Sequence, residues 1–394
     1  MIYFVVLILL LVPVVKYDLM AKTGGEKIWY YFNLVVLILL AGLRYRVGGD
    51  TLMYMSMFDE IPTLNELKYF DFDTAKFNPL WYIINAVSKT IHDEFFLFQI
   101  IHACIVNPVF FYFFRKYSPN YYFTVILFYY VGYYCYFNME VMRESLCICM
   151  LLLSFHFMYQ KRWLLYYAVC ICALLMHYSA LVMFLFPFLL LFFKKPSWKI
   201  QLSLFILIFI FTLVVNVPML LLSMLSLDEQ LMLLAEKYLE NERNIMGMLS
   251  LFIQYLPLLG MIYLRERYDI RMPFDFTSIV LGVVVVYAFS MNLTGVNRLV
   301  NYFIPFILVY TVNTIYYVIS NIKPMFSMGY SVLLSSLFVL SFNYYFYYAK
   351  DVSSSYPDTR FYAIFHPYHS VFFPEQDEHR ERFIENYRDV IIEF

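Results

Sequence analysis

Residues 202–215 read LSLFILIFIFTLVV, a run in which Ser203 and Thr212 are the only polar side chains. Residues 181–193 and 279–291 are similarly apolar, and short polar breaks separate such runs along the chain. A helix that crosses the roughly 30 Å hydrocarbon core of a bilayer needs about 20 mostly apolar residues. The runs lack the alternation of apolar and polar positions that marks the strands of a membrane barrel. They therefore predict helices that span a membrane.

The composition of the whole chain agrees with this interpretation. Of its 394 residues, 62% are hydrophobic and 14% are charged, whereas soluble domains carry about 25% charged residues. The formal net charge is -1 and there is no run of Lys or Arg, so the composition does not favour a nucleic-acid partner. The six cysteines have no zinc-finger spacing and are expected to pack inside helices.

We predict an all-α fold, a polytopic transmembrane helical bundle of about 12 spans with short interfacial helices on the outer face. The expected spans are 2–17, 28–43, 95–114, 121–137, 143–159, 163–177, 179–193, 200–222, 248–264, 274–292, 299–319 and 328–348. The first run has no positive segment before it and no small-residue cleavage site after it, so we expect it to remain as a span.

Basic residues gather in alternate breaks between the expected spans. By the positive-inside rule, these breaks face the cytoplasm. They contain Lys16, Lys22, Lys27, Arg115, Lys116, Lys161, Arg162, Lys194, Lys195, Lys199, Arg265, Arg267, Arg271 and Lys323. Both termini then lie outside the cytoplasm, as do the loops 44–94 and 223–247. The expected organisation is a transmembrane helical domain over 1–348 followed by an extracytoplasmic tail over 349–394.

Each of the two outer loops contains a segment that favours a helix on the membrane surface. Residues 79–91 are apolar but too short to cross a bilayer, which indicates an interfacial or re-entrant helix. Residues 227–239 place apolar side chains on one helical face and acids on the other. Both are expected on the outer face.

The stretch 42–51, GLRYRVGGDT, begins where the second expected span emerges outside, and Tyr54 follows it. Arg44 and Arg46 provide planar cationic forks, and the paired glycines let the backbone approach a ligand, which suits a phosphate or pyrophosphate. The alternative is an ordinary loop whose arginines meet lipid headgroups. Asp50 favours the first interpretation, because a lipid anchor needs no acid.

The stretch 138–146, NMEVMRESL, places three charged residues at the start of an apolar run. An ionisable residue at membrane depth usually faces a polar cavity and has a partner, so Arg143 is a functional candidate. The alternative is a structural ion pair of Arg143 with Glu140 or Glu144. The two acids are four residues apart and can share one helical face near the arginine.

His177 interrupts an apolar stretch that is too long for one crossing, so the chain must turn within 177–180, HYSA. The predicted topology puts this turn outside, where a neutral imidazole can accept a proton from a hydroxyl. The alternative is a histidine that is hydrogen-bonded within the turn.

Arg298, in the stretch 292–299, NLTGVNRL, opens another span from the outside, four residues before Tyr302. Outer loops are expected to be poor in arginine, yet Arg44, Arg46, Arg143 and Arg298 all fall there. If these four side chains converge, they form an anion site at the lipid–water boundary.

These motifs, taken in order, resemble the EpsG family of Wzy-like bacterial polysaccharide polymerases. The similarity rests on 42–50 with Tyr54, on Arg143 at the start of a span, on 177–180, and on Arg298 with Tyr302-Phe303. It covers most of the chain, and the first motif is the most specific.

The resemblance implies polymerisation of polyprenyl-pyrophosphate-linked oligosaccharide repeat units on the outer face of the bacterial cytoplasmic (inner) membrane. It implies membrane lipids, a flippase and a chain-length regulator as partners. Such glycosyl transfer needs cations on the departing phosphates, a base for the acceptor hydroxyl, and sugar contacts. The donor in such a reaction is lipid-linked rather than a metal-held nucleotide sugar, so no cofactor or metal is expected.

These needs assign roles to the candidate residues. The expected pyrophosphate-binding residues are Arg44, Arg143, Arg298 and Arg46, and the expected sugar-binding residues are Tyr54, Glu140, Glu144 and Tyr302. For the base the choice lies between His177 and Asp50. An imidazole titrates near pH 6.5, whereas arginines lower the pKa of an aspartate below about 3.9, which favours His177.

Two other functions stay open at this point. A flippase or transporter of lipid-linked glycans also uses internal cations, but internal repeats are absent and the unusual charges lie on one face. A membrane-bound sugar acyltransferase is the third alternative, since His177 suits it as well.

Overall fold

A computed structural model describes residues 2–70, 78–192, 197–214, 245–270, 274–290, 296–322 and 361–393. Throughout these ranges the regular structure is helical, and extended backbone pairs only in the isolated bridges Arg44–Ser370 and Ser370–Phe373. The chain is therefore an all-α membrane protein. It divides into two compact units, one formed by Met1–Leu181 with Ser336–Phe394 and the other by Val182–Ser335.

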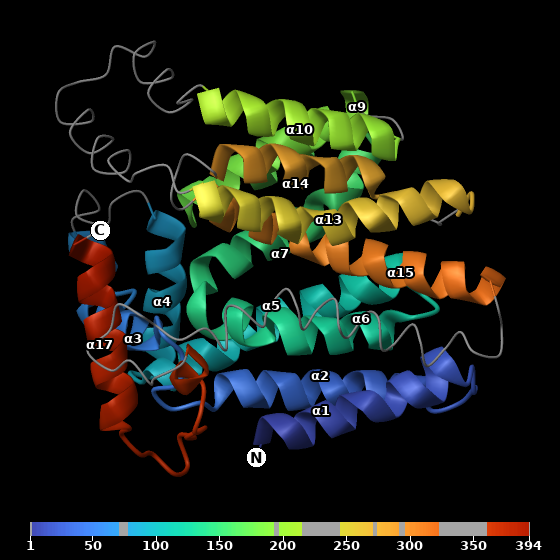
Figure 1. Ribbon diagram of the computed structural model, residues 1–394. Coiled ribbons are helices and arrows are strands. Elements are labelled where there is room, and N and C mark those ends of the chain that lie inside the picture. The colour runs from blue at the N-terminus through green and yellow to red at the C-terminus, as the bar shows by residue number, and fades with distance from the viewer. Residues whose placement is uncertain are drawn as a thin grey trace. The chain divides into compact units, whose positions relative to one another are not determined.

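The first unit is built on long apolar helices that run side by side in Figure 1. They are α1 (Ile2–Pro13, extended by the π-helical η1, Val14–Leu19), α2 (Glu26–Gly42), α5 (Phe95–Tyr117), α6 (Tyr122–Tyr129, extended by η3, Tyr130–Tyr134, and η4, Tyr136–Glu140), α7 (Met142–Tyr159) and α8 (Trp163–Leu174). Helix α5 packs against α2 and α7, and α7 packs against α8. Aromatic rings fill the interior; Phe110, for example, lies 4.9 Å from Tyr129 and 5.5 Å from Phe137 between ring centres.

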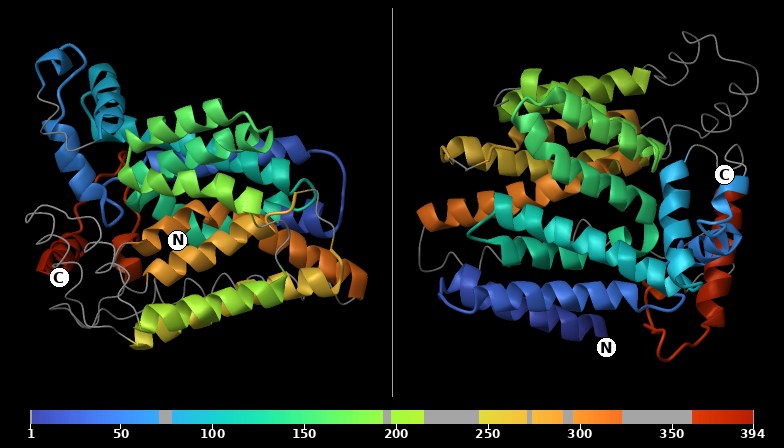
Figure 2. Two further views of the ribbon diagram at one scale, coloured as in Figure 1. Left: turned by 90° about the horizontal axis from the view of Figure 1, so that it is seen from above. Right: turned by 180° about the vertical axis from the view of Figure 1, so that it is seen from behind.

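Shorter helices gather at one end of this unit, steeply inclined to the long ones (Figures 1 and 2). They are α3 (Thr51–Glu60), η2 (Leu67–Tyr69), α4 (Pro79–Ile91), η7 (Phe361–Ile364) and α17 (Glu378–Glu393). Asn78 and Pro79 start α4 at the predicted residue, because the fixed backbone angle of proline suits the first position of a helix. This is the end that the sequence predicts to face outward.

The second unit contains η5 (Tyr178–Leu185, which begins in the first unit), α9 (Phe186–Phe192), α10 (Trp198–Val214), α13 (Ile245–Arg267), α14 (Thr277–Ser290), η6 (Val296–Tyr302) and α15 (Ile304–Ile322). Helix α14 packs against α9, α10 and η6. Gly282 makes this packing possible, since a Cβ atom there would lie 2.6 Å from Cε1 of Phe303.

In the described part of the chain, three helices are long and apolar enough to cross a membrane: Ile2–Leu19, Phe95–Tyr117 and Met142–Tyr159. Four further expected spans coincide with shorter apolar helices, Trp163–Leu174, Tyr178–Leu190, Trp198–Ile208 and Ile304–Val318, and the number of about 12 stays a prediction. The span 179–193 is divided into a 3-10 helix and a short α-helix, η5 and α9. The expected span 328–348, the surface helix 227–239, and most of the loop 223–247 lie outside the described residues.

Candidate functional site

The loop after α2 is held in place by the buried side chain of Arg44. Gly42 ends α2 against α5, where a Cβ atom would lie 2.8 Å from Cγ1 of Ile100. From there Arg44, 1% exposed, donates to the carbonyl oxygens of Ala41 at 2.5 Å and Val47 at 3.1 Å. Its Nη2 also lies 3.4 Å from Sδ of Met142 at the start of α7. Burial lowers the pKa of Arg44 to about 10. Arg44 thus joins the end of α2, its own loop and α7.

The two glycines of the loop bring its backbone against Glu140. Gly48 has a φ of +113°, a conformation that glycine adopts without strain. The Gly49 N–H donates to Oε1 of Glu140 at 2.5 Å, and a Cβ atom on Gly49 would lie 2.6 Å from Oε2. Burial, followed by the nearby carboxylate of Asp50, raises the pKa of Glu140 to about 8. Glu140 therefore binds a proton more tightly than an ordinary carboxyl does, and it lies near Asp50, the residue that precedes α3.

Tyr54, Trp81 and Arg143 meet next to this pair of acids. The Tyr54 and Trp81 rings lie 5.4 Å apart, and Cζ of Arg143 lies 5.9 Å from the first ring centre and 6.0 Å from the second. Burial raises the pKa of Tyr54 to about 12, Asp50 adds to this shift, and Arg143 opposes it. The buried Nε of Arg143 and the buried Nε1 of Trp81 have no hydrogen-bond partner. The structure thus brings Asp50, Tyr54, Glu140 and Arg143 into one charged neighbourhood.

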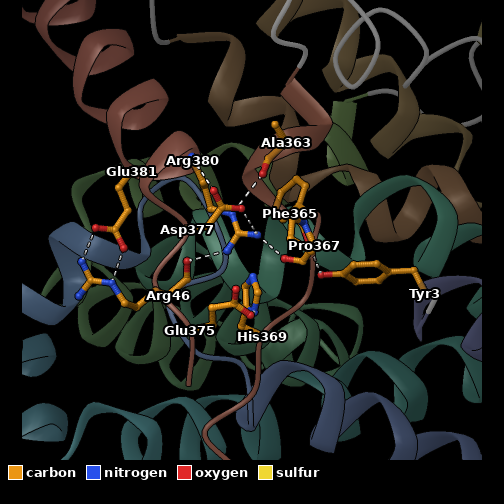
Figure 3. Close-up of polar contacts among 10 residues, drawn as sticks. All are labelled: Tyr3, Arg46, Ala363, Phe365, Pro367, His369, Glu375, Asp377, Arg380 and Glu381. Atoms are coloured by element: carbon orange, nitrogen blue, oxygen red, sulfur yellow. Dashed lines mark hydrogen bonds and ion pairs between the residues drawn. The ribbon is translucent and has the colours of Figure 1, made fainter. Parts of the chain in front are cut away.

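The C-terminal tail covers the other side of the same loop (Figure 3). Arg46, whose φ is +52°, pairs with both carboxylate oxygens of Glu381 on α17 at 2.5 and 2.8 Å, and this bond raises its pKa. Backbone hydrogen bonds of 2.9 Å also join Tyr45 to His369 and Gly48 to Ile364. Arg46 therefore links the loop to the tail.

Arg380, one residue before Glu381, is the polar centre of the tail (Figure 3). It is 1% exposed and donates to the carbonyl oxygens of Arg46 and Ala363, each at 3.1 Å, and to that of Pro367. Asp377 lies 3.6 Å from its Nη2. The tail thus binds the backbone of the glycine loop as well as the side chain of Arg46.

Glu144 and His177 also belong to the first unit. Glu144 lies in the first turn of α7 and is 3% exposed. His177 follows α8, stacks on Tyr178 at 4.4 Å, and has its Nδ1 2.7 Å from Oγ and 3.2 Å from the backbone N–H of Ser179. Because this N–H donates to Nδ1, the neutral ring carries its proton on Nε2.

The N-terminal end of α4 connects the His177 segment to the rest of the unit, since the Leu80 N–H donates to the carbonyl of Leu175 at 3.1 Å. Arg298 and Tyr302 lie in η6 of the second unit; the first is exposed and the second is fully buried. The convergence of Arg298 with the other three arginines stays a prediction.

Sequence reasoning did not select Trp81, Arg380, Glu381 or Ser179. Trp81 had a local signal, a tryptophan in the first turn of a short amphipathic helix beside the predicted outer face. The charges of 378–393 looked like those of a solvated helix, and nothing in the sequence distinguishes buried Arg380 from exposed Arg382. No three His, Cys, Asp or Glu side chains of the described ranges gather as metal ligands.

The structure thus defines an all-α membrane protein with arginines and paired acids at one end of its first helical unit. A model of the EpsG family matches residues 27–368. The chain belongs to the EpsG family, a Wzy-like family of polysaccharide polymerases, and this confirms the resemblance read from the motifs. Neither a curated protein nor a solved structure matches the chain. Helix α17 lies beyond the matched residues.

Proposed function

We propose that this protein joins polyprenyl-pyrophosphate-linked oligosaccharide repeat units on the outer face of the bacterial cytoplasmic membrane. Membership of the EpsG family supports the class of reaction. The observation that carries the proposal is the position of Arg143. Its Nε has no partner, its guanidinium lies near the rings of Tyr54 and Trp81, and Tyr54 also feels the charges of Asp50 and Glu140.

The reaction moves one growing chain onto the next unit. A hydroxyl oxygen of the acceptor unit forms a bond to C1 of the reducing-end sugar of the growing chain. The bond from C1 to the pyrophosphate oxygen breaks, its electron pair leaves on the pyrophosphate, and the hydroxyl proton passes to a base. Negative charge therefore accumulates on the phosphate oxygens, where fixed cations accelerate the step.

Arg143 is the cation best suited to contact the departing pyrophosphate, because its Nε has no partner within the protein. Arg44 and Arg46 use their forks on the loop backbone and on Glu381, so in this proposal they position the loop and add positive potential. Arg298 is proposed to join them from the second unit.

Asp50 and His177 are the two candidates for the base. Burial raises the pKa of Glu140, so in this proposal Glu140 is the protonated member of the carboxyl pair and Asp50 is the carboxylate that takes up a proton. The neutral ring of His177 has Nδ1 occupied by Ser179 and a proton on Nε2, which suits donation to a phosphate oxygen. We therefore assign proton removal to Asp50 and phosphate contact to His177. Tyr54, Glu140, Glu144 and Tyr302 are the proposed sugar contacts; the lipid-linked unit, a flippase and a chain-length regulator are the proposed partners.

Deletion of the gene in its host tests the function directly. A polymerase mutant displays single repeat units on the outer face. Units trapped inside the cell would instead indicate a flippase, and full-length polymer that lacks a substituent would indicate an acyltransferase. Extraction of lipid-linked glycans, with labelling of the cell surface, distinguishes the three results, and the intact gene supplied in trans should restore long polymer.

A further inference from the structure

The buried face of α4 carries a row of polar atoms without partners. Trp81, Asn85 and Ser88 are spaced by four and three residues, so they lie on one side of the helix, and each is at most 1% exposed. Trp81 Nε1, Asn85 Oδ1 and Ser88 Oγ all lack a hydrogen-bond partner. The amide nitrogen of Asn85 is engaged, since it donates to the Trp81 carbonyl at 2.8 Å. The row extends along two turns of the helix.

Such a row is unfavourable unless something pairs with it. More than nine in ten buried polar groups in native proteins find a partner, and each unpaired one costs about 1–3 kcal/mol. The Nε of Arg143 belongs to the same neighbourhood, because its Cζ lies 6.0 Å from the Trp81 ring. Three unpaired polar groups of α4, the first of them near the unpaired Nε of Arg143, favour a polar ligand.

The donors and acceptors of the row suit a carbohydrate ligand. Trp81 and Arg143 offer N–H donors, Asn85 offers an acceptor, and Ser88 can do both. Phosphate oxygens only accept, so they cannot satisfy Oδ1 of Asn85, and a lipid chain satisfies none of these groups. Sugar hydroxyls donate and accept, and the C–H face of a sugar packs on aromatic rings such as those of Trp81 and Tyr54, 5.4 Å apart.

We propose that the face Trp81–Asn85–Ser88 binds the sugars of a lipid-linked unit, with Arg143 at its pyrophosphate end. This inference rests on the proposed function and adds to it a binding surface for the glycan. It makes Asn85 and Ser88 contacts to the substrate that the motifs do not contain.

The double variant Asn85→Leu with Ser88→Ala, expressed in the deletion host, tests the proposal. Loss of two sugar contacts should lower polymer yield about tenfold or more. Thermal unfolding of the purified protein in detergent should stay at the wild-type temperature or rise, because the change removes unpaired polar atoms from a buried position. A lower polymer yield together with undiminished stability is a combination that a structural role does not produce.

Asn33→Leu on α2 is the matched control. Asn33 is also fully buried with both amide atoms unpartnered. Its neighbour Tyr30 packs on Phe111, whereas Trp81 packs on Phe98, about 20 Å away along α5. This control should polymerise as the wild type does.

Two results would overturn the proposal: a double variant that polymerises normally, which would leave the row to ordered water, or an equal loss of polymer in Asn33→Leu. If the double variant does not accumulate, Ser88→Ala alone and Trp81→Phe give the same test with smaller changes. Failure here leaves the deletion phenotype intact. Failure of the proposed function appears instead as a deletion strain without single units at its surface.

Discussion

Two arginines near the glycine loop, one fully buried and one half-buried, differ in how their donors are used. Arg380 in the tail binds three carbonyl oxygens and lies beside Asp377, and its side chain is 1% exposed. Arg143 at the start of α7 faces two aromatic rings and keeps an unpaired Nε. Arg380, each of whose three nitrogens donates to a carbonyl oxygen, stabilises the fold, whereas Arg143 has an unpaired Nε that can be offered to a ligand. The hydrogen bonds of Arg380 hold the loop that carries Asp50, and this loop lies near Arg143.

The largest effect is expected from breaking the tail network. Arg380→Met leaves three carbonyl oxygens without their side-chain donor and Asp377 without its cation, which should lower the free energy of unfolding by about 3 kcal/mol. Thermal unfolding in detergent and limited proteolysis of the tail measure it. Arg382→Met is the control, since Arg382 is 62% exposed and pairs only with Glu378 one turn away. Equal stability of the two variants would show that the buried network of Arg380 adds no more to the free energy of unfolding than an exposed ion pair does.

The second-largest effect is expected from changing Arg143, and it should alter the polymer yield without altering stability. Arg143→Lys keeps the charge but removes the planar fork, so polymer yield should drop by about 30-fold or more while the unfolding temperature stays the same. Arg46→Lys is the matched change in the tail network. Its polymer yield should fall only a few-fold, because in this proposal Arg46 binds Glu381 and not the substrate. Normal polymer from Arg143→Lys would make this residue a structural cation like Arg44.

The sequence allowed the all-α class and the limits of α4 to be predicted, and it singled out 42–51 and 138–146 as candidate segments. These depend on long apolar runs, on a proline at a helix start, and on charges that need partners near a membrane. The sequence did not predict which arginines bind other parts of the protein and which keep a free donor, because this depends on contacts between distant segments. Arg46 meets Glu381 across 335 positions, and no local pattern distinguishes a paired guanidinium from an unpaired one. The tautomer of His177 likewise follows from one backbone N–H that only the fold positions.

The smallest effect concerns the proton on Glu140. This residue contacts the glycine loop, which the tail network of Arg380 holds on one side and Arg143 approaches on the other. The folded protein raises the pKa of this carboxyl from its ordinary value of 4.5 to about 8, chiefly by burial. Between these values the folded state binds a proton that the unfolded state has lost, so stability falls as the pH rises. The contribution is complete below about 4.5 and is lost as the pH passes through about 8. From pH 7 to pH 9 the free energy of unfolding should therefore decrease by on the order of 1 kcal/mol.

Glu140→Gln isolates this contribution. A glutamine oxygen can still accept the Gly49 N–H, and the neutral amide resembles the protonated acid, so the variant should keep its stability at pH 9. Glu60→Gln, an exposed change on α3, should retain the wild-type dependence on pH. Unfolding temperatures in detergent at pH 6, 7, 8 and 9 would measure the difference. If wild type and Glu140→Gln respond alike to pH, Glu140 is already ionised at neutral pH. Asp50 then has a charged neighbour that opposes its own ionisation, and proton removal is better assigned to His177.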